Sequence, residues 1–128
     1  MRVIDTSAWI ETIKGSALAP LLTAEFPAPE ESIVPTLVQH ELAKWLTREQ
    51  SSELAERVIA YTLTCQVVVL DTVIALKAAG LARQHRLSTA DAIIYATAQS
   101  QNAQLITCDA HFEGLPDVLF FAKPDRPE

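Results

Sequence analysis

Glycine and cysteine are both scarce in this sequence, with three and two residues respectively among 128. The small number of glycines and the lack of low-complexity tracts exclude a collagen-like or disordered chain. Cys65 and Cys108 are too few to form the framework of a disulfide-rich domain. No apolar run approaches the roughly 20 residues of a membrane-spanning helix, and Asp5 interrupts the apolar core that a signal peptide needs. We therefore expect a cytoplasmic protein that does not contact a membrane.

Basic residues are outnumbered by acidic ones, ten to sixteen, which leaves a formal net charge of −6. A protein that binds nucleic acid through a general basic surface has the opposite balance. An enzyme acting on nucleic acid is compatible with this charge if metal ions or a local basic patch offset the repulsion. The length and a hydrophobic fraction of 49% suffice for an independent core, so we expect one domain over residues 1–128.

Short apolar runs alternate with helical periodicity along the chain. The runs predict strands over residues 2–4, 32–34, 66–70, 104–107 and 118–121. The periodicity predicts helices over residues 8–14, 16–25, 36–50, 52–64, 72–86 and 88–102. In the helix over 72–86, the expected apolar face consists of Val73, Leu76, Ala79 and Leu81. This alternation is typical of a three-layer α/β/α fold with a mainly parallel central sheet, where ligands bind at the carboxyl ends of the strands.

Four acidic residues occupy positions that suit a solvated carboxylate poorly. Asp5 and Asp109 each follow a predicted strand, Glu41 lies on the apolar face of its helix, and Asp91 begins an apolar helix. Taken singly, Asp5 and Asp109 can be turn formers, Asp91 a capping acid and Glu41 a surface residue. Taken together, they meet in the strand-end crevice, and ionised carboxylates that crowd there need a counter-charge. Oxygen ligands favour Mg²⁺ or Mn²⁺, which commonly serve phosphodiester hydrolysis.

Two basic residues follow Glu41 on the same side of its helix. Lys44 and Arg48 stand three and seven positions after it, so their side chains flank the carboxylate. They are candidates for binding the phosphates of a substrate, with a solvated helix face as the alternative.

Four segments match a known family in order and spacing. They are Val3-Ile4-Asp5-Thr6-Ser7, His40-Glu41-Leu42, Leu87-Ser88-Thr89-Ala90-Asp91-Ala92-Ile93-Ile94-Tyr95-Ala96 and Leu105-Ile106-Thr107-Cys108-Asp109-Ala110-His111-Phe112. Across nearly its whole length the chain resembles the PIN-domain ribonucleases, and among them the VapC-like toxins of toxin–antitoxin pairs.

The resemblance implies a PIN fold and an endoribonuclease that uses Mg²⁺ or Mn²⁺. Asp5, Glu41, Asp91 and Asp109 are then the catalytic and metal-binding quartet, and these acidic positions all match the family pattern. Supporting hydrogen bonds are implied for Thr6 or Ser7 and for Thr107. The implied partners are an RNA substrate, a VapB-like antitoxin whose tail occupies the acidic cleft, and a second copy of the chain in a homodimer.

Other interpretations of the same residues are open to test. A phospho-receiver signalling domain has a similar length and charge, with Asp71 at the end of a central apolar strand as its acceptor and Lys123 after the last strand. A catalytically silent PIN domain that serves as an interaction module is a further alternative. A zinc-protease motif is excluded because Lys44 replaces the second histidine. Cys108 and His111 have no second pair at zinc spacing, which favours a buried cysteine and a loop histidine.

Overall fold

Five parallel strands form the central layer of the molecule in a computed structural model that describes residues 1–124. They are β1 (Arg2–Ile4), β2 (Ser32–Pro35), β3 (Gln66–Val68), β4 (Gln104–Thr107) and β5 (Val118–Phe120). Their order across the sheet is β3-β2-β1-β4-β5, and every neighbouring pair is parallel. Val3 of β1 pairs with Ile33 on one side and with Leu105 on the other. The first strand of the chain therefore lies at the centre of the sheet.

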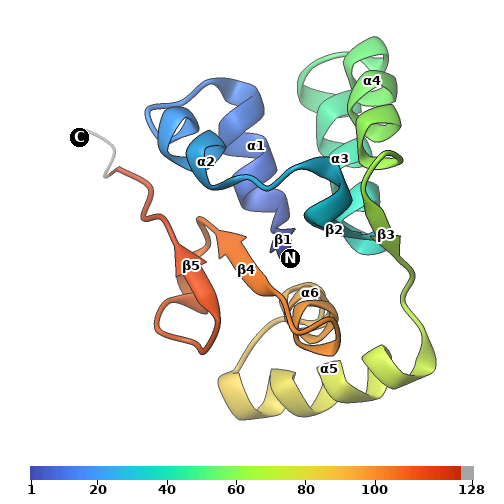
Figure 1. The fold of residues 1–128 in the computed structure, drawn as a ribbon, viewed down its shortest axis with the longest axis vertical. Helices are drawn as coiled ribbons and strands as arrows, with labels where there is room; N and C mark the ends of the chain where they lie inside the picture. The colour runs from blue at the N-terminus through green and yellow to red at the C-terminus, as the bar shows by residue number, and fades with distance from the viewer. Residues whose placement is uncertain (125–128) are drawn as a thin grey trace.

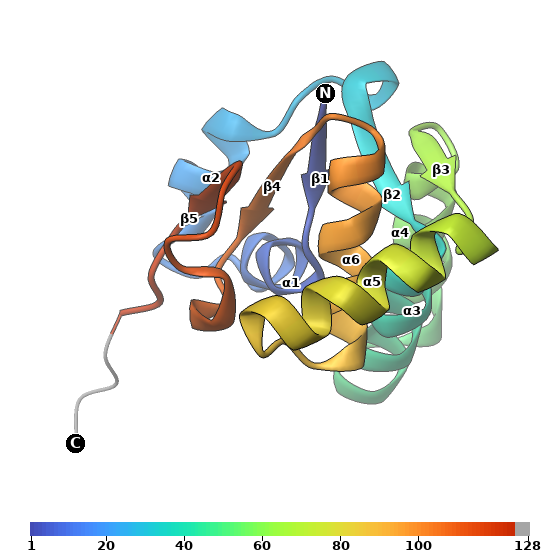
Figure 2. The same ribbon diagram turned by 90° about the horizontal axis from the view of Figure 1, so that it is seen from below.

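Helices cover both faces of this sheet. They are α1 (Thr6–Lys14), α2 (Ala19–Glu25), α3 (Thr36–Glu49), α4 (Ser52–Thr62), α5 (Thr72–His85) and α6 (Thr89–Ser100), with 3₁₀ turns η1 (Pro29–Glu31) and η2 (Ala110–Phe112). Figure 1 shows α1 to α4 on one side of the strands and α5 with α6 on the other. Figure 2 shows α6 lying along the sheet with α5 outside it. The three-layer α/β/α fold with a parallel sheet is thus confirmed.

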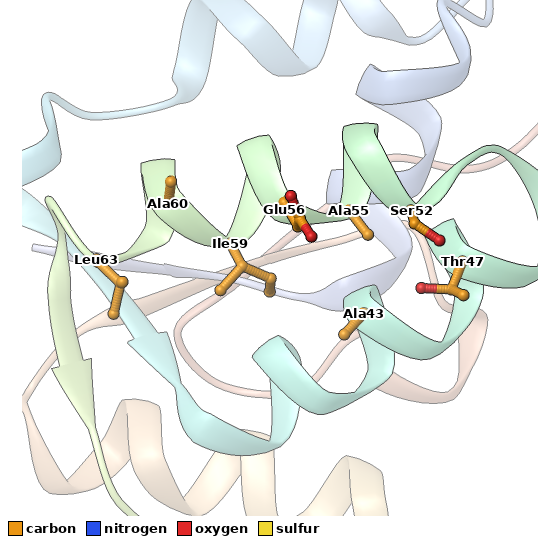
Figure 3. Close-up of a pocket in the computed structure, with 8 residues that line it drawn as sticks. All are labelled: Ala43, Thr47, Ser52, Ala55, Glu56, Ile59, Ala60 and Leu63. Atoms are coloured by element: carbon orange, nitrogen blue, oxygen red, sulfur yellow. The ribbon is translucent and has the colours of Figure 1, made fainter.

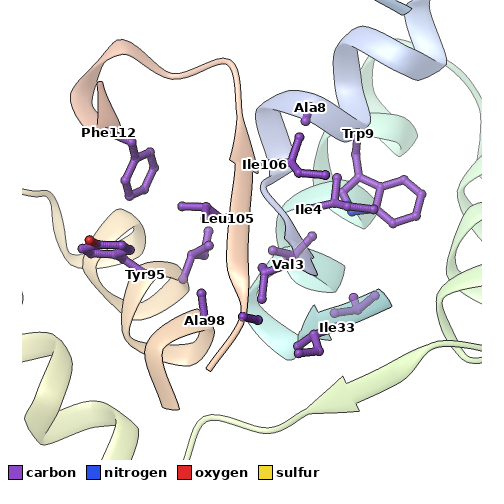
Figure 4. Packing of buried hydrophobic residues seen from close by; sticks show 14 of the residues in the cluster. Val3, Ile4, Ala8, Trp9, Ile33, Tyr95, Ala98, Leu105, Ile106 and Phe112 are labelled. Carbon is purple, nitrogen blue, oxygen red and sulfur yellow. The ribbon is translucent and has the colours of Figure 1, made fainter. Parts of the chain in front are cut away.

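The three inner strands, β2, β1 and β4, are mostly apolar because both of their faces are buried. Figure 4 shows Leu105 of β4 on the side of Tyr95 and Ala98, and Ile106 on the side of Ala8. Leu105 and Ile106 are both 0% exposed, as expected where alternate side chains point to opposite faces. The polar residues that follow β1 and β4 therefore stand at the end of a rigid core.

Side-chain caps define where three of the helices begin. The side chains of Ser51, Asp71 and Ser88 accept hydrogen bonds from backbone N–H groups in the first turns of α4, α5 and α6. At the other end of α1, Gly15 adopts a left-handed conformation with φ of 66°, which glycine tolerates best. Asp71 is thus the N-cap of α5, with Oδ1 2.9 Å from the amide nitrogen of Ile74.

Some sequence-based expectations about elements are wrong. Helix α1 begins at Thr6, directly after Asp5, and α2 begins at Ala19. Strand β3 ends at Val68 and lies at the edge of the sheet, so Asp71 does not follow a central strand as an acceptor aspartate in a receiver domain must. The bends at η1 and η2 were also unforeseen, because three-residue 3₁₀ turns leave no periodic pattern.

The apolar face expected for α5 is wrong at Val73, Leu76 and Ala79, which are exposed, and correct at Leu81, which is buried. Val73 and Leu76 are 71% and 70% exposed, whereas Ile74, Ala78 and Leu81 are buried. The helix is apolar nearly all round, so periodicity alone did not identify the face that packs on α6. None of the helices described over residues 1–124 is long and apolar enough to cross a membrane.

Candidate metal centre

The strand order places a crevice between the carboxyl ends of β1 and β4. The chain leaves β1 towards β2 and β3 on one side and later returns to β4 and β5 on the other, which is a topological switch point. The backbone N–H of Asp5 donates to the carbonyl oxygen of Ile106 at 2.8 Å, so the two strand ends stay side by side. Asp5 and Asp109 therefore lie at the same edge of the sheet, as the sequence predicts.

Asp5 is the most deeply buried of the four candidate carboxylates, at 3% exposure. Its Oδ2 accepts hydrogen bonds from the hydroxyls of Ser7 at 2.6 Å and Thr107 at 2.8 Å. The Ser7 and Thr107 hydroxyls in turn accept from the backbone N–H groups of Cys108 and Asp109, each at 3.0 Å. This network holds the Asp5 carboxylate against the start of the segment after β4.

Glu41 is held by the residue that follows Asp5. The Thr6 hydroxyl donates to Oε1 of Glu41 at 2.7 Å. Glu41 belongs to α3, which continues directly from β2, so its carboxylate reaches the crevice from the other neighbour of β1. All three supporting hydroxyls therefore donate to candidate metal ligands. Thr6 donates to Glu41, and Ser7 and Thr107 donate to Asp5.

Asp91 enters the crevice from the opposite layer. It lies in the first turn of α6, where the Ser88 hydroxyl accepts from the Asp91 backbone N–H at 3.2 Å. The capping bond therefore uses the Asp91 backbone, and the side chain, 17% exposed, faces the acids of the sheet edge. The carboxylate also forms a side-chain hydrogen bond with Ser88 that lowers its pKa, but burial and the charges of Asp109 and Asp5 outweigh this contact.

A histidine joins two of these acids. Nδ1 of His111 lies 2.8 Å from Oδ1 of Asp109 and 3.8 Å from Oδ2 of Asp91. Ligand atoms of Asp91, Asp109 and His111 all lie within 4.8 Å of one another. The sequence predicts a loop histidine at position 111. The Asp-x-His spacing after a strand is the one local signal for this contact, and the turn η2 directs the imidazole at Asp91.

The site raises the pKa of its buried carboxyl groups. Burial raises the pKa of Asp5 above its usual value, and the charges of Asp109 and Glu41 add to this, although the hydrogen bonds from Ser7 and Thr107 oppose it. Burial, followed by the charges of Asp109 and Asp5, raises the pKa of Asp91 to about 6. The donors are mainly carboxylate oxygens in a site where negative charge is unfavourable. This donor set fits a hard divalent cation such as Mg²⁺ or Mn²⁺.

Two hollows flank the carboxylates, one on each side of the start of α1. One, of about 330 Å³, is lined by Thr6, Ile10, Leu37, His40, Glu41, Lys44, Trp45 and Arg48. The other, of about 550 Å³, is lined by Ser7, Cys108, Asp109, Ala110, Glu113, Phe120, Ala122 and Lys123. Lys44 and Arg48 therefore share a hollow with Glu41, as expected from their helical spacing, and an aromatic ring accompanies cations in both hollows.

A third hollow is chemically different. It lies between α3 and α4, is about 440 Å³, and its walls carry mostly small or apolar side chains such as Ala43, Ala55 and Ile59 (Figure 3). Glu56 is the one ionisable side chain among its lining residues. None of the four candidate carboxylates lines this groove.

Comparison with known proteins places this geometry in context. The sequence profile of the PIN domain family matches residues 2–118. No curated protein matches the sequence significantly.

Three solved structures share the fold. A toxin–antitoxin complex from Klebsiella pneumoniae aligns with a TM-score of 0.79 and 22% identity, over 93% of this chain and 96% of that one. VapC20 of Mycobacterium tuberculosis, a toxin that cleaves the sarcin–ricin loop, gives 0.76 and 23%, over 92% and 97%. VapBC-1 of nontypeable Haemophilus influenzae gives 0.70 and 21%, over 94% and 96%. At these identities the similarity establishes the fold.

Proposed function

The chain belongs to the PIN domain family, and from this premise we propose that it is a metal-dependent endoribonuclease, the toxin of a VapBC-like toxin–antitoxin pair. The observation that carries this proposal is the convergence of Asp5, Asp91 and Asp109 from three separate elements into one crevice. The charge of Asp109 raises the pKa of both Asp5 and Asp91, and the charge of Asp5 raises that of Asp91. A fold that needs these residues only as turns and caps gains nothing from such repulsion.

The chain's own residues suit hydrolysis of a phosphodiester bond. Asp5, Glu41, Asp91 and Asp109 are the residues that would hold the cation. A bound Mg²⁺ or Mn²⁺ supplies Lewis-acid stabilisation of phosphate oxygens and lowers the pKa of a water molecule. One carboxylate of this group can act as the base that takes a proton from the attacking water. Ser7 and Thr107 keep Oδ2 of Asp5 in a set orientation, which limits reorganisation during the reaction.

The function is tested by incubating purified, antitoxin-free protein with total RNA and mapping the cut ends. Discrete fragments are expected with Mg²⁺ or Mn²⁺ and none with EDTA. Intact RNA under all of these conditions, with protein shown to be folded by circular dichroism, would refute the nuclease. Labelling by acetyl phosphate at Asp71 would instead favour the receiver alternative, which the edge position of β3 already disfavours.

We propose that the hollow beside Glu41 binds the RNA next to the scissile bond. Lys44 and Arg48 are both exposed, although Arg48 Nε also lies 2.8 Å from Oε1 of Glu49. Trp45 lines the same hollow, so a base can stack there while the cations contact phosphates. This arrangement resolves the conflict between an acidic protein and a polyanionic substrate, because its basic residues are local to the site.

Lys44→Gln and Arg48→Gln are expected to raise KM for a short single-stranded RNA severalfold with a smaller change in kcat. Each should also lower the slope of log KM against log salt by about 0.7, the value for one lost phosphate contact with a single strand. The matched control is Lys77→Gln on α5, on the other side of the sheet. Unchanged KM and salt slopes in both hollow variants would assign Lys44 and Arg48 to a solvated helix face.

The antitoxin is expected to present Arg or Lys side chains to the acidic crevice. Several structural neighbours are toxin–antitoxin or VapBC complexes. Cations pair most strongly with carboxylates that are partly desolvated. A zero-length carboxyl-to-amine cross-linker applied to the co-purified complex should join an antitoxin lysine to Asp91 or Asp109. An antitoxin segment rich in Asp and Glu at this site would contradict the expectation.

We also propose that the free chain forms a homodimer. Val69, Leu70, Val73 and Leu76 are 46–71% exposed and follow one another along the entry to α5 and its outer face. Contiguous apolar surface of this kind marks protein–protein contact, and a second copy presents the same apolar surface in return.

A further inference from the structure

His111 is held over the acidic crevice by the residue that follows it. Phe112 is 0% exposed, and its ring lies edge-on to that of Tyr95, with centroids 6.0 Å apart. Tyr95 belongs to α6, the helix that carries Asp91 one turn earlier, and its hydroxyl donates to the carbonyl oxygen of Pro116 at 2.7 Å. The turn η2 is thereby fixed to α6, and the position of His111 relative to Asp91 is set by the core.

One ligand atom from each of Asp91, Asp109 and His111 lies close enough to the others for all three to reach one ion. Two ligands of an octahedral ion with bonds of about 2.1 Å lie about 3.0 Å apart when adjacent and about 4.2 Å apart when opposite. Nδ1 of His111 lies 2.8 Å from Asp109 Oδ1, close to the separation of adjacent ligands. It lies 3.8 Å from Asp91 Oδ2, between the separations of adjacent and opposite ligands. The imidazole is also 74% exposed, so it can shift by a few tenths of an ångström without disturbing the core.

We propose that His111 supplies an imidazole nitrogen to the metal site, next to Asp91 and Asp109, and that the site therefore prefers Mn²⁺ to Mg²⁺. This inference rests on the metal site of the proposed function and adds a ligand of a different type to the carboxylate quartet. Mg²⁺ strongly favours oxygen donors and keeps its waters. A first-row transition ion gains more from an imidazole ligand than Mg²⁺ does, so one nitrogen ligand shifts the preference of the site towards Mn²⁺.

The test uses the metal-free full chain and Mn²⁺ or Mg²⁺ alone as probes, measured by titration calorimetry. Wild type is expected to bind Mn²⁺ at least about tenfold more tightly than Mg²⁺. His111→Ala should weaken Mn²⁺ binding about tenfold or more and Mg²⁺ binding no more than about twofold. His40→Ala is the matched control, because His40 is exposed in the neighbouring hollow. Thermal melts verify that each variant is folded. Both side chains are exposed, so we expect neither substitution to disturb the core.

Electron spin-echo spectroscopy of bound Mn²⁺ adds a readout independent of affinity and of catalysis. Nitrogen-14 modulation from a directly bound imidazole should be present in wild type and in His40→Ala and absent in His111→Ala. Modulation that persists in His111→Ala would overturn the proposal. So would equal losses of Mn²⁺ and Mg²⁺ affinity without modulation in wild type, since His111 would then only orient Asp109 by a hydrogen bond.

These outcomes separate the inference from the function on which it rests. Tight Mn²⁺ binding without nitrogen modulation, together with RNA cleavage, would overturn the role of His111 and leave the nuclease intact. If wild type binds neither ion, both proposals are refuted: the role of His111 as a ligand and the metal-dependent nuclease.

Discussion

Asp5→Asn, Asp91→Asn and Asp109→Asn are each expected to reduce metal-dependent RNA cleavage by at least about a thousandfold. Asparagine keeps the shape of aspartate but removes an anionic oxygen ligand, so the loss falls on metal binding and transition-state charge and leaves packing largely unchanged. For Asp5, the carboxamide oxygen can still accept from the Ser7 and Thr107 hydroxyls, which places the NH₂ group where the second carboxylate oxygen stood. Cleavage of a defined RNA under single-turnover conditions, with and without Mg²⁺, measures the effect.

Asp71→Asn is the matched control for these three variants. Asp71 is exposed and caps α5 through Oδ1, and asparagine caps a helix about as well as aspartate. Cleavage by Asp71→Asn should equal that of wild type. Full activity in folded Asp91→Asn protein would show that the quartet is wrongly assigned, while loss of activity in Asp71→Asn alone would revive the receiver interpretation.

Without metal, Asp91→Asn is expected to be more stable than wild type at neutral pH. Burial and the charges of Asp109 and Asp5 raise the folded-state pKa of Asp91 from 3.8 to about 6. At about 1.36 kcal/mol per pH unit, this difference sets an upper limit of about 3 kcal/mol on the cost of ionising Asp91 in the folded protein. Partial exposure of the side chain and screening by salt bring the expected gain nearer 1–2 kcal/mol, or several degrees in Tm.

The pH dependence follows from linkage. Between pH 3.8 and about 6 the folded state holds more protons on Asp91 than the unfolded chain does, so stability falls as the pH rises through this window. Above about pH 6, Asp91 is ionised in both states, and the folded protein bears the full free-energy cost of that charge. Wild type and Asp91→Asn should therefore have similar stability near pH 3.5 and diverge up to neutral pH. Parallel curves across this range would contradict the raised pKa.

Loss of a helix cap is the main effect that could oppose the expected stabilisation of Asp91→Asn, and the cap of α6 does not depend on the Asp91 side chain. A lost helix cap would cost about 0.5–2 kcal/mol, but the cap bond of α6 runs from the Asp91 backbone N–H to Ser88, and asparagine keeps it. Millimolar Mg²⁺ should then stabilise wild type, by about 2.7 kcal/mol at a hundred times Kd, and Asp91→Asn much less. Melts with EDTA and with Mg²⁺ measure both effects. Equal Mg²⁺-induced shifts would show that Asp91 lies outside the metal site.

The elements that position the site could largely be predicted from the sequence. Strands and helices depend on the spacing of apolar residues within about 15 positions, and β1, β4 and α6 begin and end within two residues of expectation. Because parallel strands end at one edge of a sheet, the meeting of Asp5 and Asp109 followed from the alternation of elements. The family resemblance predicted that Glu41 and Asp91 lie in the same crevice.

Only the tertiary structure determined which residues far apart in the chain contact one another. Thr6 bonds to Glu41 across 35 positions and Thr107 to Asp5 across 102, and no local pattern encodes these partners. The exposure of Val73 and Leu76 depends on which side of a helix that is apolar nearly all round meets α6. His111 faces Asp91 because Phe112 packs against Tyr95. Local spacing thus determined which carboxylates the chain offers, while packing of the core decided their distances, their pKa values and the histidine beside them.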